Sequence, residues 1–415
     1  MRRDCPLSSL LARPVGLLPA GLLALAAVVL GSAGGAAAGE TVLIGAVNSL
    51  TGRFAAQGTA VQRGLELAVE EANAGGRVPG ITLELATRDD EGRPDRAVAA
   101  AEDLLGRRGA VALAGGYVDT LVGPLSEVAE RYRRPYVATA SLDERLSQRG
   151  YRYFFRVSSL AGYVEAMAGF VTDHLKARRV ALLSSNTPGA AQLGRRLRER
   201  FERAGVAVPV AEALGAGMAD FTPFLARVRE AGVEVLVANA FFADHLVLAR
   251  QLRALAVNLK GYLGAFGMEF PEVVKELGGA GDLLFGTTGW QPGVTAPGTE
   301  EASRAFVAAY RARFGAEPPP LAMHGHAAGQ ALVAALRAAR ARGGSVPEPD
   351  ALRGELLKVD LPHPLSRLQF NAQGDPLYYE RVILQLQQGR PVVVYPPVRA
   401  TGRTIYPMPS WQDRR

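Results

Sequence analysis

The hydrophobic pattern of residues 41–76 predicts a strand, a loop and a helix, in that order. Residues 41–47 are almost continuously apolar and rich in β-branched side chains, which is typical of a strand buried on both faces of a parallel sheet. From about Thr59 the apolar residues recur with the spacing of one helix face, until the Asn-Ala-Gly-Gly sequence at 73–76 ends the helix. Ligands of open α/β sheets bind beyond the carboxyl ends of the strands, so the loop at 49–58 is expected to face a ligand.

The same alternation of strand-like and helix-like segments continues along most of the chain. It is typical of a parallel sheet with helices on both faces. The pattern begins afresh near residue 180, and since a single sheet of so many strands would be unusual, two sheets of similar size are expected. The strands predicted after the first one are 81–87, 110–114, 136–138, 153–157, 180–184, 206–213, 233–238, 261–264 and 283–288.

Beyond Trp290 the strand pattern stops and then returns. Helices without intervening strands are expected to cover the first sheet, and the turn sequences at 374–375 and 388–389 predict a small β addition near the end. The proline-rich residues 396–415 are expected to form an extended strap. The predicted helices of this region are 301–314, 322–342 and 349–357, and its predicted strands are 366–370, 379–386 and 391–395.

Residues 1–38 have the pattern of a secretory signal peptide. Arginines near the start precede an apolar run at 15–30, which is too short and too weakly flanked for a membrane span, and small residues at 36–38 offer a cleavage site. The alternative, an uncleaved anchor, would show a cluster of charges directly after the run, and none follows there. Cys5, the only cysteine, lies in this segment, so the mature protein is expected to lack thiols and disulfides. These features predict export to the periplasm as a soluble protein.

The composition is that of an ordinary globular protein. The 415 residues, of which 48% are hydrophobic and 21% charged, are enough for two domains. The net charge of +7 would suit nucleic acid, but the basic residues are spread thinly, and the cluster at 195–198 stands among glutamates on a predicted helix surface. A solvated helix face is the favoured interpretation, and no nucleic-acid partner is expected.

Motifs that would indicate catalysis or metal binding are weak. His324 and His326 are two residues apart and share no helix face, so polar residues at a helix start are favoured over a metal site. The acidic residues 89–91 follow a strand and precede a helix, where a turn with N-terminal charges is favoured over a cation site. The sequence has no G-x-S-x-G motif and no mature cysteine for nucleophilic chemistry.

Several segments spread along the chain share the pattern of one known family. They are IGAVNSLTG at 44–52, RGLELAVEEANAGG at 63–76, AGGYVDTLVGPLSEVAERYRRPYVATAS at 114–141, VEVLVANAFFADHLVLARQLRA at 233–254 and GDPLYYERVILQLQQG at 374–389. Together they resemble the periplasmic leucine/isoleucine/valine-binding proteins of ABC importers, over nearly all of residues 41–395. The resemblance implies an α/β fold of two doubly wound parallel-sheet lobes, joined by a hinge of three crossovers and closing around a small molecule.

The resemblance also implies the division of the chain. The N-terminal lobe would comprise 41–157 and 289–367, and the C-terminal lobe 158–288 and 368–395, with the strap at 396–415. The crossovers are expected near 156–160, 285–288 and 368–371.

The family's ligand contacts can be carried over residue by residue. In the first lobe they fall on the opening loop, the turn at 117–120 and the loop at 140–142, and in the second lobe on the loops after three strands. The implied ligand-binding residues are Gln57, Tyr117, Val118, Asp119, Thr120, Ala140, Ser141, Leu142, Asn186, Phe241 and Phe266.

Three of these positions depart from the family's usual pattern. Hydroxyl residues that help to hold a ligand carboxylate usually stand where Asp119 and Leu142 stand, and an acidic residue for the ligand ammonium usually stands where Phe266 is aligned. A standard aliphatic amino acid is therefore expected to bind weakly. Asp119 either contacts the ligand or caps the helix that begins near Leu121. A shifted alignment would make Glu269 the ammonium partner instead.

These expectations favour a solute-binding receptor of an ABC importer. The receptor would be a monomer that captures a small amino acid, amide or aromatic or carboxylate-like molecule by hinge closure, and would deliver it to a permease and ATPase complex at the inner membrane. One alternative is a ligand-sensing subunit with the same fold. Another, a secreted enzyme, would need a nucleophile or metal constellation that the sequence lacks, so no catalytic residues, metal or cofactor are predicted.

Overall fold

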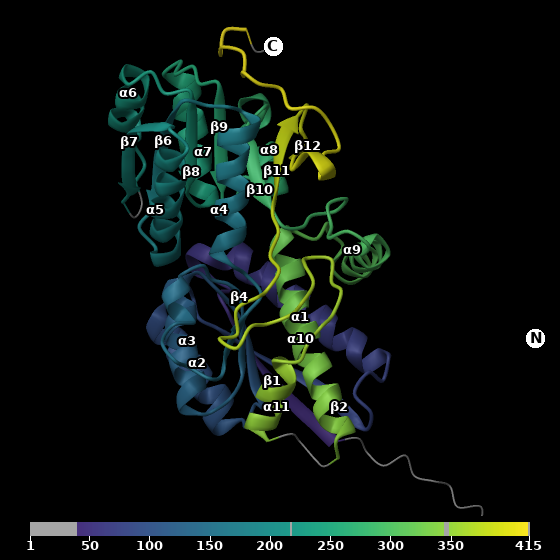
Figure 1. The fold of residues 1–415 in the computed structure, drawn as a ribbon. Helices are drawn as coiled ribbons and strands as arrows, with labels where there is room; N and C mark the ends of the chain where they lie inside the picture. The colour runs from purple at the N-terminus through teal and green to yellow at the C-terminus, as the bar shows by residue number, and fades with distance from the viewer. Residues whose placement is uncertain (1–39, 216–217, 344–347, 414–415) are drawn as a thin grey trace, which may run out of the picture. The chain divides into compact units, whose positions relative to one another are not determined.

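The computed structural model describes residues 40–215, 218–343 and 348–413 (Figure 1). The predicted signal peptide, with Cys5, lies outside these residues. Among the helices described there, none is long and apolar enough to cross a membrane. Two sheets organise the described chain, and helices pack against each of them, which confirms the predicted class of two parallel-sheet lobes. The exact division of the chain between the lobes stays a prediction.

The first lobe is built on a five-stranded parallel sheet in the order β2-β1-β3-β4-β5. The central strand β3 is buried along its whole length, whereas the edge strand β2 exposes alternate residues such as Thr82 and Glu84. The strands are β1 Glu40–Asn48, β2 Ile81–Asp89, β3 Ala112–Tyr117, β4 Tyr136–Ala140 and β5 Phe154–Arg156, and the helices between them are α1 Ala55–Ala74, α2 Pro94–Glu102 and α3 Asp119–Arg131.

The second lobe contains a seven-stranded sheet in the order β12-β11-β10-β9-β8-β6-β7. Five strands are parallel, β11 pairs antiparallel with β10, and β12 pairs antiparallel with β11. The strands are β6 Arg179–Ser185, β7 Ala207–Leu214, β8 Val235–Asn239, β9 Gly261–Ala265, β10 Phe285–Thr288, β11 Val382–Gln387 and β12 Arg390–Tyr395. The helices are α4 Leu160–Gly169, α5 Pro188–Arg203, α6 Thr222–Glu230, α7 Phe242–Ala254 and α8 Pro271–Leu277.

Three further helices lie between β10 and β11 in the sequence: α9 Glu300–Phe314, α10 Pro320–Ala341 and α11 Pro349–Leu356. Helix α10 returns to the first lobe, where it packs along α1 and contacts β3 and β4, as the sequence predicts (Figure 1). The two helices approach so closely that a Cβ on Gly64 would lie 1.9 Å from the carbonyl oxygen of Ala322, and a Cβ on Gly325 would lie 2.0 Å from that of Val61. Glycine is therefore required on both sides of this crossing.

One predicted strand is wrong. Residues 366–370 form no strand, and only isolated bridges join Leu368 to Leu361 and Phe370 to Pro376. Directly after this segment, the side-chain oxygen of Asn371 accepts hydrogen bonds from the backbone N–H groups of Gln373 and Asp375, each at 2.9 Å. The backbone is thereby held in a tight turn instead of a sheet ladder.

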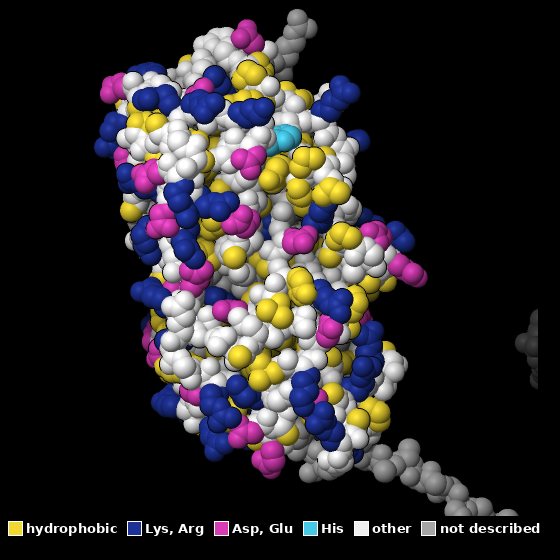
Figure 2. All heavy atoms as spheres, in the orientation of Figure 1, with side chains coloured by type: hydrophobic (Ala, Val, Ile, Leu, Met, Phe, Trp, Pro, Cys, Tyr) yellow, Lys and Arg dark blue, Asp and Glu magenta, His cyan; other side chains and the backbone are white. Residues whose placement is uncertain are grey.

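Charged side chains of both signs are interspersed on the surface shown in Figure 2. The basic cluster predicted at 195–198 lies on α5, where Arg198 pairs with Glu202 at 2.7 Å and Arg196 approaches Glu144 at 3.3 Å. These arginines are therefore partnered by acidic groups of the protein itself, as expected of a solvated helix face.

Candidate ligand-binding cleft

A cavity lies where loops of the two lobes meet. In the first lobe its lining follows strands β3 and β4, and in the second lobe it follows β6, β8 and β9, so the carboxyl ends of parallel strands from both sheets contribute. Helix α10 and the segment before β11 complete the wall. The cavity measures about 60 Å³. One water needs roughly 10–15 Å³ by this measure, so the space is small.

Most of the residues implied by the family resemblance line this cavity. Three do not: Gln57 is buried in α1, and Thr120 and Asn186 are exposed. A ligand-binding role for any of them stays a prediction. The lining residues among those predicted are Tyr117, Val118, Asp119, Ala140, Ser141, Leu142, Phe241 and Phe266.

Four chemically important lining residues were not predicted as site residues: Tyr163, His324, Tyr379 and Arg381. Tyr163 lies on α4, His324 lies on α10, and the other two lie just before β11. None of them directly follows a strand, whereas most of the ligand contacts implied by the resemblance lie in strand-end loops. The available signal was Arg381 itself, because an arginine directly before the apolar run 382–384 of a strand needs a buried partner.

Aromatic rings form a continuous band across the cavity. Tyr117 from the first lobe lies 6.3 Å from Phe241 of the second, measured between ring centroids. Phe241 lies 5.9 Å from Phe266, and Phe266 lies 5.3 Å from Tyr163. The spacings are those of favourable tilted and edge contacts, so the band offers flat apolar surface to a ligand.

Two lining residues have a left-handed backbone. Val118 has φ 63° and ψ 149°, and Phe266 has φ 64°. These conformations are costly for β-branched and bulky residues, and such strain concentrates at ligand sites, where the surrounding structure enforces it. Both residues also belong to the predicted ligand contacts, one in each lobe.

Arg381 is the buried cation of the cleft. Only 6% of the residue is exposed, and its guanidinium lies 3.9 Å from the ring centroid of Tyr163. It donates hydrogen bonds to the carbonyl oxygen of Thr287 at 3.0 Å and to the hydroxyl of Tyr379 at 2.7 Å. A cation that is stacked and bonded in this way is fixed in position before any ligand arrives.

Glu269 lines the same cavity and remains partly exposed to it. Desolvation by the surrounding protein raises its pKa, and the positive charge of Arg381 opposes that shift without reversing it. One carboxylate oxygen accepts a hydrogen bond from the N–H of Gly267 at 2.8 Å. The acid expected for a ligand ammonium under the shifted alignment is thus present, but Arg381 already compensates part of its charge.

The hydrogen-bond network fixes the tautomer of His324. Its Nδ1 lies 3.2 Å from the carbonyl oxygen of Pro320, which can only accept, so this nitrogen carries the proton. Its Nε2 then accepts from the hydroxyl of Tyr379 at 3.0 Å. Burial and, as a smaller cause, the nearby charge of Arg381 lower the pKa of His324 to about 3. The imidazole is therefore neutral at physiological pH.

His324 should make the protein acid-sensitive. Because its pKa in the folded protein is about 3, below the 6.5 of an unfolded chain, its contribution to stability is complete above about pH 6.5 and is lost as the pH falls. We expect His324→Gln to reduce the loss of stability between about pH 6.5 and pH 5 by roughly 1.4 kcal/mol per pH unit. Urea unfolding at several pH values measures this. The control His174→Gln removes a half-buried histidine and should change the slope less; equal slopes for His324→Gln and the natural protein would contradict the prediction.

His326, which the sequence analysis considered together with His324, has different partners. His326 contacts His363 at 3.0 Å and Glu71 at 3.2 Å, away from the residues that line the cleft. Both histidines are buried, and they lie in the first two turns of α10, near the helix start as the sequence predicted. Within the described ranges, no group of three or more His, Cys, Asp or Glu residues is arranged to hold a metal ion.

Asp119 lines the cavity, where its predicted contact with a ligand stays a prediction, but its carboxylate does not cap α3. It is the first residue of α3, and its side chain bonds to no N–H of that helix. One oxygen accepts from the backbone N–H groups of Leu142 at 2.7 Å and Asp143 at 2.8 Å, and the other accepts from Gly189 at 2.9 Å. The capping interpretation is wrong for its own helix, and all three bonds go to the loop after β4 and the start of α5.

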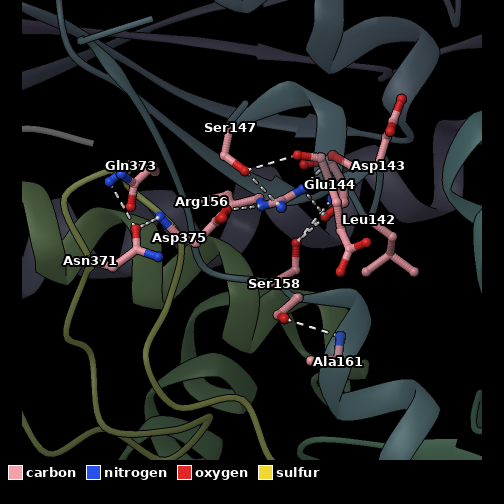
Figure 3. Close-up of polar contacts among 12 residues, drawn as sticks. Leu142, Asp143, Glu144, Ser147, Arg156, Ser158, Ala161, Asn371, Gln373 and Asp375 are labelled. Atoms are coloured by element: carbon pink, nitrogen blue, oxygen red, sulfur yellow. Dashed lines mark hydrogen bonds and ion pairs between the residues drawn. The ribbon is translucent and has the colours of Figure 1, made fainter. Parts of the chain in front are cut away.

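Arg156 and Ser158 also hold the loop after β4 in place (Figure 3). Arg156, which is 2% exposed, forms an ion pair with Asp375 at 2.6 Å, and its Nη1 donates to the carbonyl oxygen of Asp143 at 2.9 Å. The hydroxyl of Ser158 donates to the carbonyl oxygen of Ser141 at 2.8 Å. The hydroxyl of Ser141, by contrast, is buried without a partner in the described part of the chain, and it belongs to a residue of the cavity wall.

Known proteins share this architecture. The Leu/Ile/Val-binding protein homolog 1 of Brucella abortus is 24% identical over 368 residues, which is 88% of this chain and 95% of the relative. A branched-chain amino acid transporter substrate-binding protein of Streptococcus pneumoniae, solved with isoleucine, has a TM-score of 0.77 at 20% identity, covering 86% of this chain and 100% of its own. A solute-binding protein of R. palustris, solved with benzoate, has a TM-score of 0.75 at 18% identity, covering 85% of this chain and 95% of its own.

The family model described as Periplasmic binding protein matches residues 41–389. This match covers the strands of both sheets except β12, all the described helices from α1 to α11 and every residue that lines the cavity. The resemblance to leucine/isoleucine/valine-binding proteins is confirmed by the relatives' names and the shared fold. The chain belongs to the periplasmic binding protein family.

Proposed function

We propose that the protein is the solute-binding receptor of an ABC importer of the branched-chain amino acid type. The observation that carries the proposal is the cavity, which is lined by strand-end loops of both lobes. A ligand that contacts both walls binds the closed arrangement better than an open one, so binding shifts the population toward closure. No bond of the ligand has to be made or broken for this task.

The cavity lining supports a small ligand with a flat or compact apolar body and one or two polar groups. The aromatic band receives the body, while Arg381, Glu269 and the free hydroxyl of Ser141 are the groups positioned for the polar ends. One relative of this fold was solved with isoleucine and another with benzoate. The fold therefore accepts both amino acids and aromatic carboxylates, and the residues that line the cavity determine which ligand binds. Amino acids, amides and aromatic carboxylates are therefore the candidate ligands.

The proposal includes the protein's location and partners. Membership of the periplasmic binding protein family supports export, and the pattern of residues 1–38 supplies a cleavable signal peptide for it. In the periplasm the receptor would act as a monomer and dock on a permease and ATPase complex at the inner membrane. Mass spectrometry of the protein secreted from its host would give the cleavage position.

A ligand screen tests the function. Isoleucine, leucine, benzoate, benzamide and related compounds are added to the protein, and thermal unfolding and solution scattering are recorded. A ligand at about one hundred times its Kd stabilises the folded state by about 2.7 kcal/mol, which raises the melting temperature. We expect the same compound to reduce the radius of gyration without changing helix content. If the compounds that raise the melting temperature leave the scattering curve unchanged, closure around the ligand is contradicted.

A further inference from the structure

The carboxylate of Asp119 joins the two lobes. Its Oδ1 is bound within the first lobe, to the N–H groups of Leu142 and Asp143, and its Oδ2 accepts from the N–H of Gly189 at 2.9 Å. Gly189 is the second residue of α5, which packs on the sheet of the second lobe. Three backbone donors from two lobes therefore converge on one buried carboxylate. Desolvation raises the pKa of Asp119, and the three hydrogen bonds oppose that shift.

The start of α5 leaves the backbone N–H of Gly189 available for a hydrogen bond to Asp119. The first N–H groups of a helix have no partner within the helix and attract anions. Pro188 occupies the first position and has no N–H, and the residue before it, Thr187, makes no side-chain cap. The N–H of Gly189 is thus the first one available, and Asp119 takes it.

Residue 189 must be glycine for this approach. A Cβ placed there would lie 2.4 Å from Oδ2 of Asp119 and 2.8 Å from Cβ of Leu142. Gly189 is not among the residues with positive φ, so its backbone conformation would tolerate any side chain. Only the closeness of the opposite lobe requires the glycine.

The same face of α5 makes two further contacts with the first lobe. The side-chain oxygen of Gln192 accepts from the N–H of Glu144 at 2.9 Å, and Arg196 approaches the carboxylate of Glu144 at 3.3 Å. Positions 189, 192 and 196 lie on one side of a helix. A strip of α5 therefore docks on the loop that forms one wall of the cavity.

We propose that the contact between Asp119 and Gly189 is a latch through which the protein itself supplies the anion that bridges the lobes. Asp119 fills the seat formed by the N–H groups of Leu142, Asp143 and Gly189, so a ligand carboxylate is not needed at this end of the cleft. The latch goes beyond the proposed receptor function, because it stabilises contact between the lobes before any ligand binds.

Solution scattering of the protein without added ligand tests the latch. Gly189→Ala places a methyl group against Asp119 and leaves every first-lobe bond intact, and Asp119→Asn removes one anionic oxygen. We expect each variant to lower the ratio of closed to open molecules by roughly tenfold, seen as a larger radius of gyration. The double variant, Gly189→Ala with Asp119→Asn, should be no more open than either single variant, because all three variants lose the same contact.

Matched controls separate the latch from general damage. Gly123→Ala is the same chemical change in α3, where the new Cβ meets only Leu146 at 3.7 Å, and Glu127→Gln removes an exposed carboxylate from the same helix as Asp119. Neither control should change the scattering curve. If Gly189→Ala scatters like Gly123→Ala, the latch does not exist. Because no ligand is added, this result is independent of the ligand screen.

Chemical rescue tests the anion seat itself. In Asp119→Ala the three N–H groups lose their acceptor, and formate is small enough to replace the missing carboxylate. We expect sodium formate to restore the smaller radius of gyration in a saturable manner, while sodium chloride at the same ionic strength does not. Equal effects of formate and chloride would contradict an anion seat made of these donors.

Discussion

An Arg381→Met variant is expected to lose about 3 kcal/mol or more of unfolding free energy. Methionine keeps much of the volume but none of the hydrogen bonds. The carbonyl oxygen of Thr287 and the hydroxyl of Tyr379 lose their donor, and the ring of Tyr163 loses its stacked cation. Glu269 also loses the positive charge that opposes its desolvation, so its pKa should rise further. Urea unfolding at neutral pH measures the loss.

Two comparison variants make the Arg381 result interpretable. Arg367→Met removes an exposed arginine that pairs with Asp360, and it should cost less than about 1 kcal/mol. Adding Glu269→Gln to Arg381→Met should recover part of the stability, because the partly desolvated acid that lost its compensating charge is then gone. A loss no larger than that of Arg367→Met would mean that Arg381 is not the structural cation of the cleft.

A Gly64→Val variant is expected to fail to accumulate as a folded protein. Even the Cβ alone would lie 1.9 Å from the carbonyl oxygen of Ala322, and this neighbour is backbone that cannot rotate away. Helices α1 and α10 would have to separate along their length, which also disturbs the sheet of the first lobe. Overpacking typically costs 1–3 kcal/mol, and we place this site at about 3 kcal/mol or more because backbone opposes backbone.

The matched control for the helix crossing is Gly354→Ala. This glycine lies inside α11, and a Cβ there meets nothing within 4 Å. Alanine should therefore stabilise the helix by up to about 1 kcal/mol. The soluble yield and melting temperature of the two variants should move in opposite directions. A Gly64→Val protein as stable as the natural one would show that the crossing is looser than described.

The fold could be predicted because its signals are local. The apolar runs, the helix spacing and the glycine turns each lie within one short segment, and the alternation of these segments fixes a parallel sheet. The error at 366–370 arose beside a turn, since the side chain of Asn371 binds the backbone N–H groups of Gln373 and Asp375 directly after the predicted strand.

The site could be predicted only where it follows the strands. Tyr117, Phe241 and Phe266 lie in the cavity wall as expected, because ligand contacts of this fold gather in strand-end loops. The role of Asp119 could not be predicted, since its partner Gly189 is 70 residues away and nothing in either segment identifies the other. Arg381 was missed for a similar reason: its contacts with Tyr163 and Thr287 arise only when the last segment returns between the lobes.

The exposed residues Thr120 and Asn186 offer a use for the protein as an optical reporter. Thr120 directly follows Asp119, and Asn186 stands just before the helix whose first free N–H meets that carboxylate. The only cysteine of the chain is at position 5, so cysteines introduced at these two positions could be labelled selectively with a pair of dyes once residues 1–38 are omitted. Energy transfer between the dyes would then fall whenever the lobes separate and rise when they meet. Such a protein would report the binding of its ligand in a mixture of metabolites as a change in emitted light.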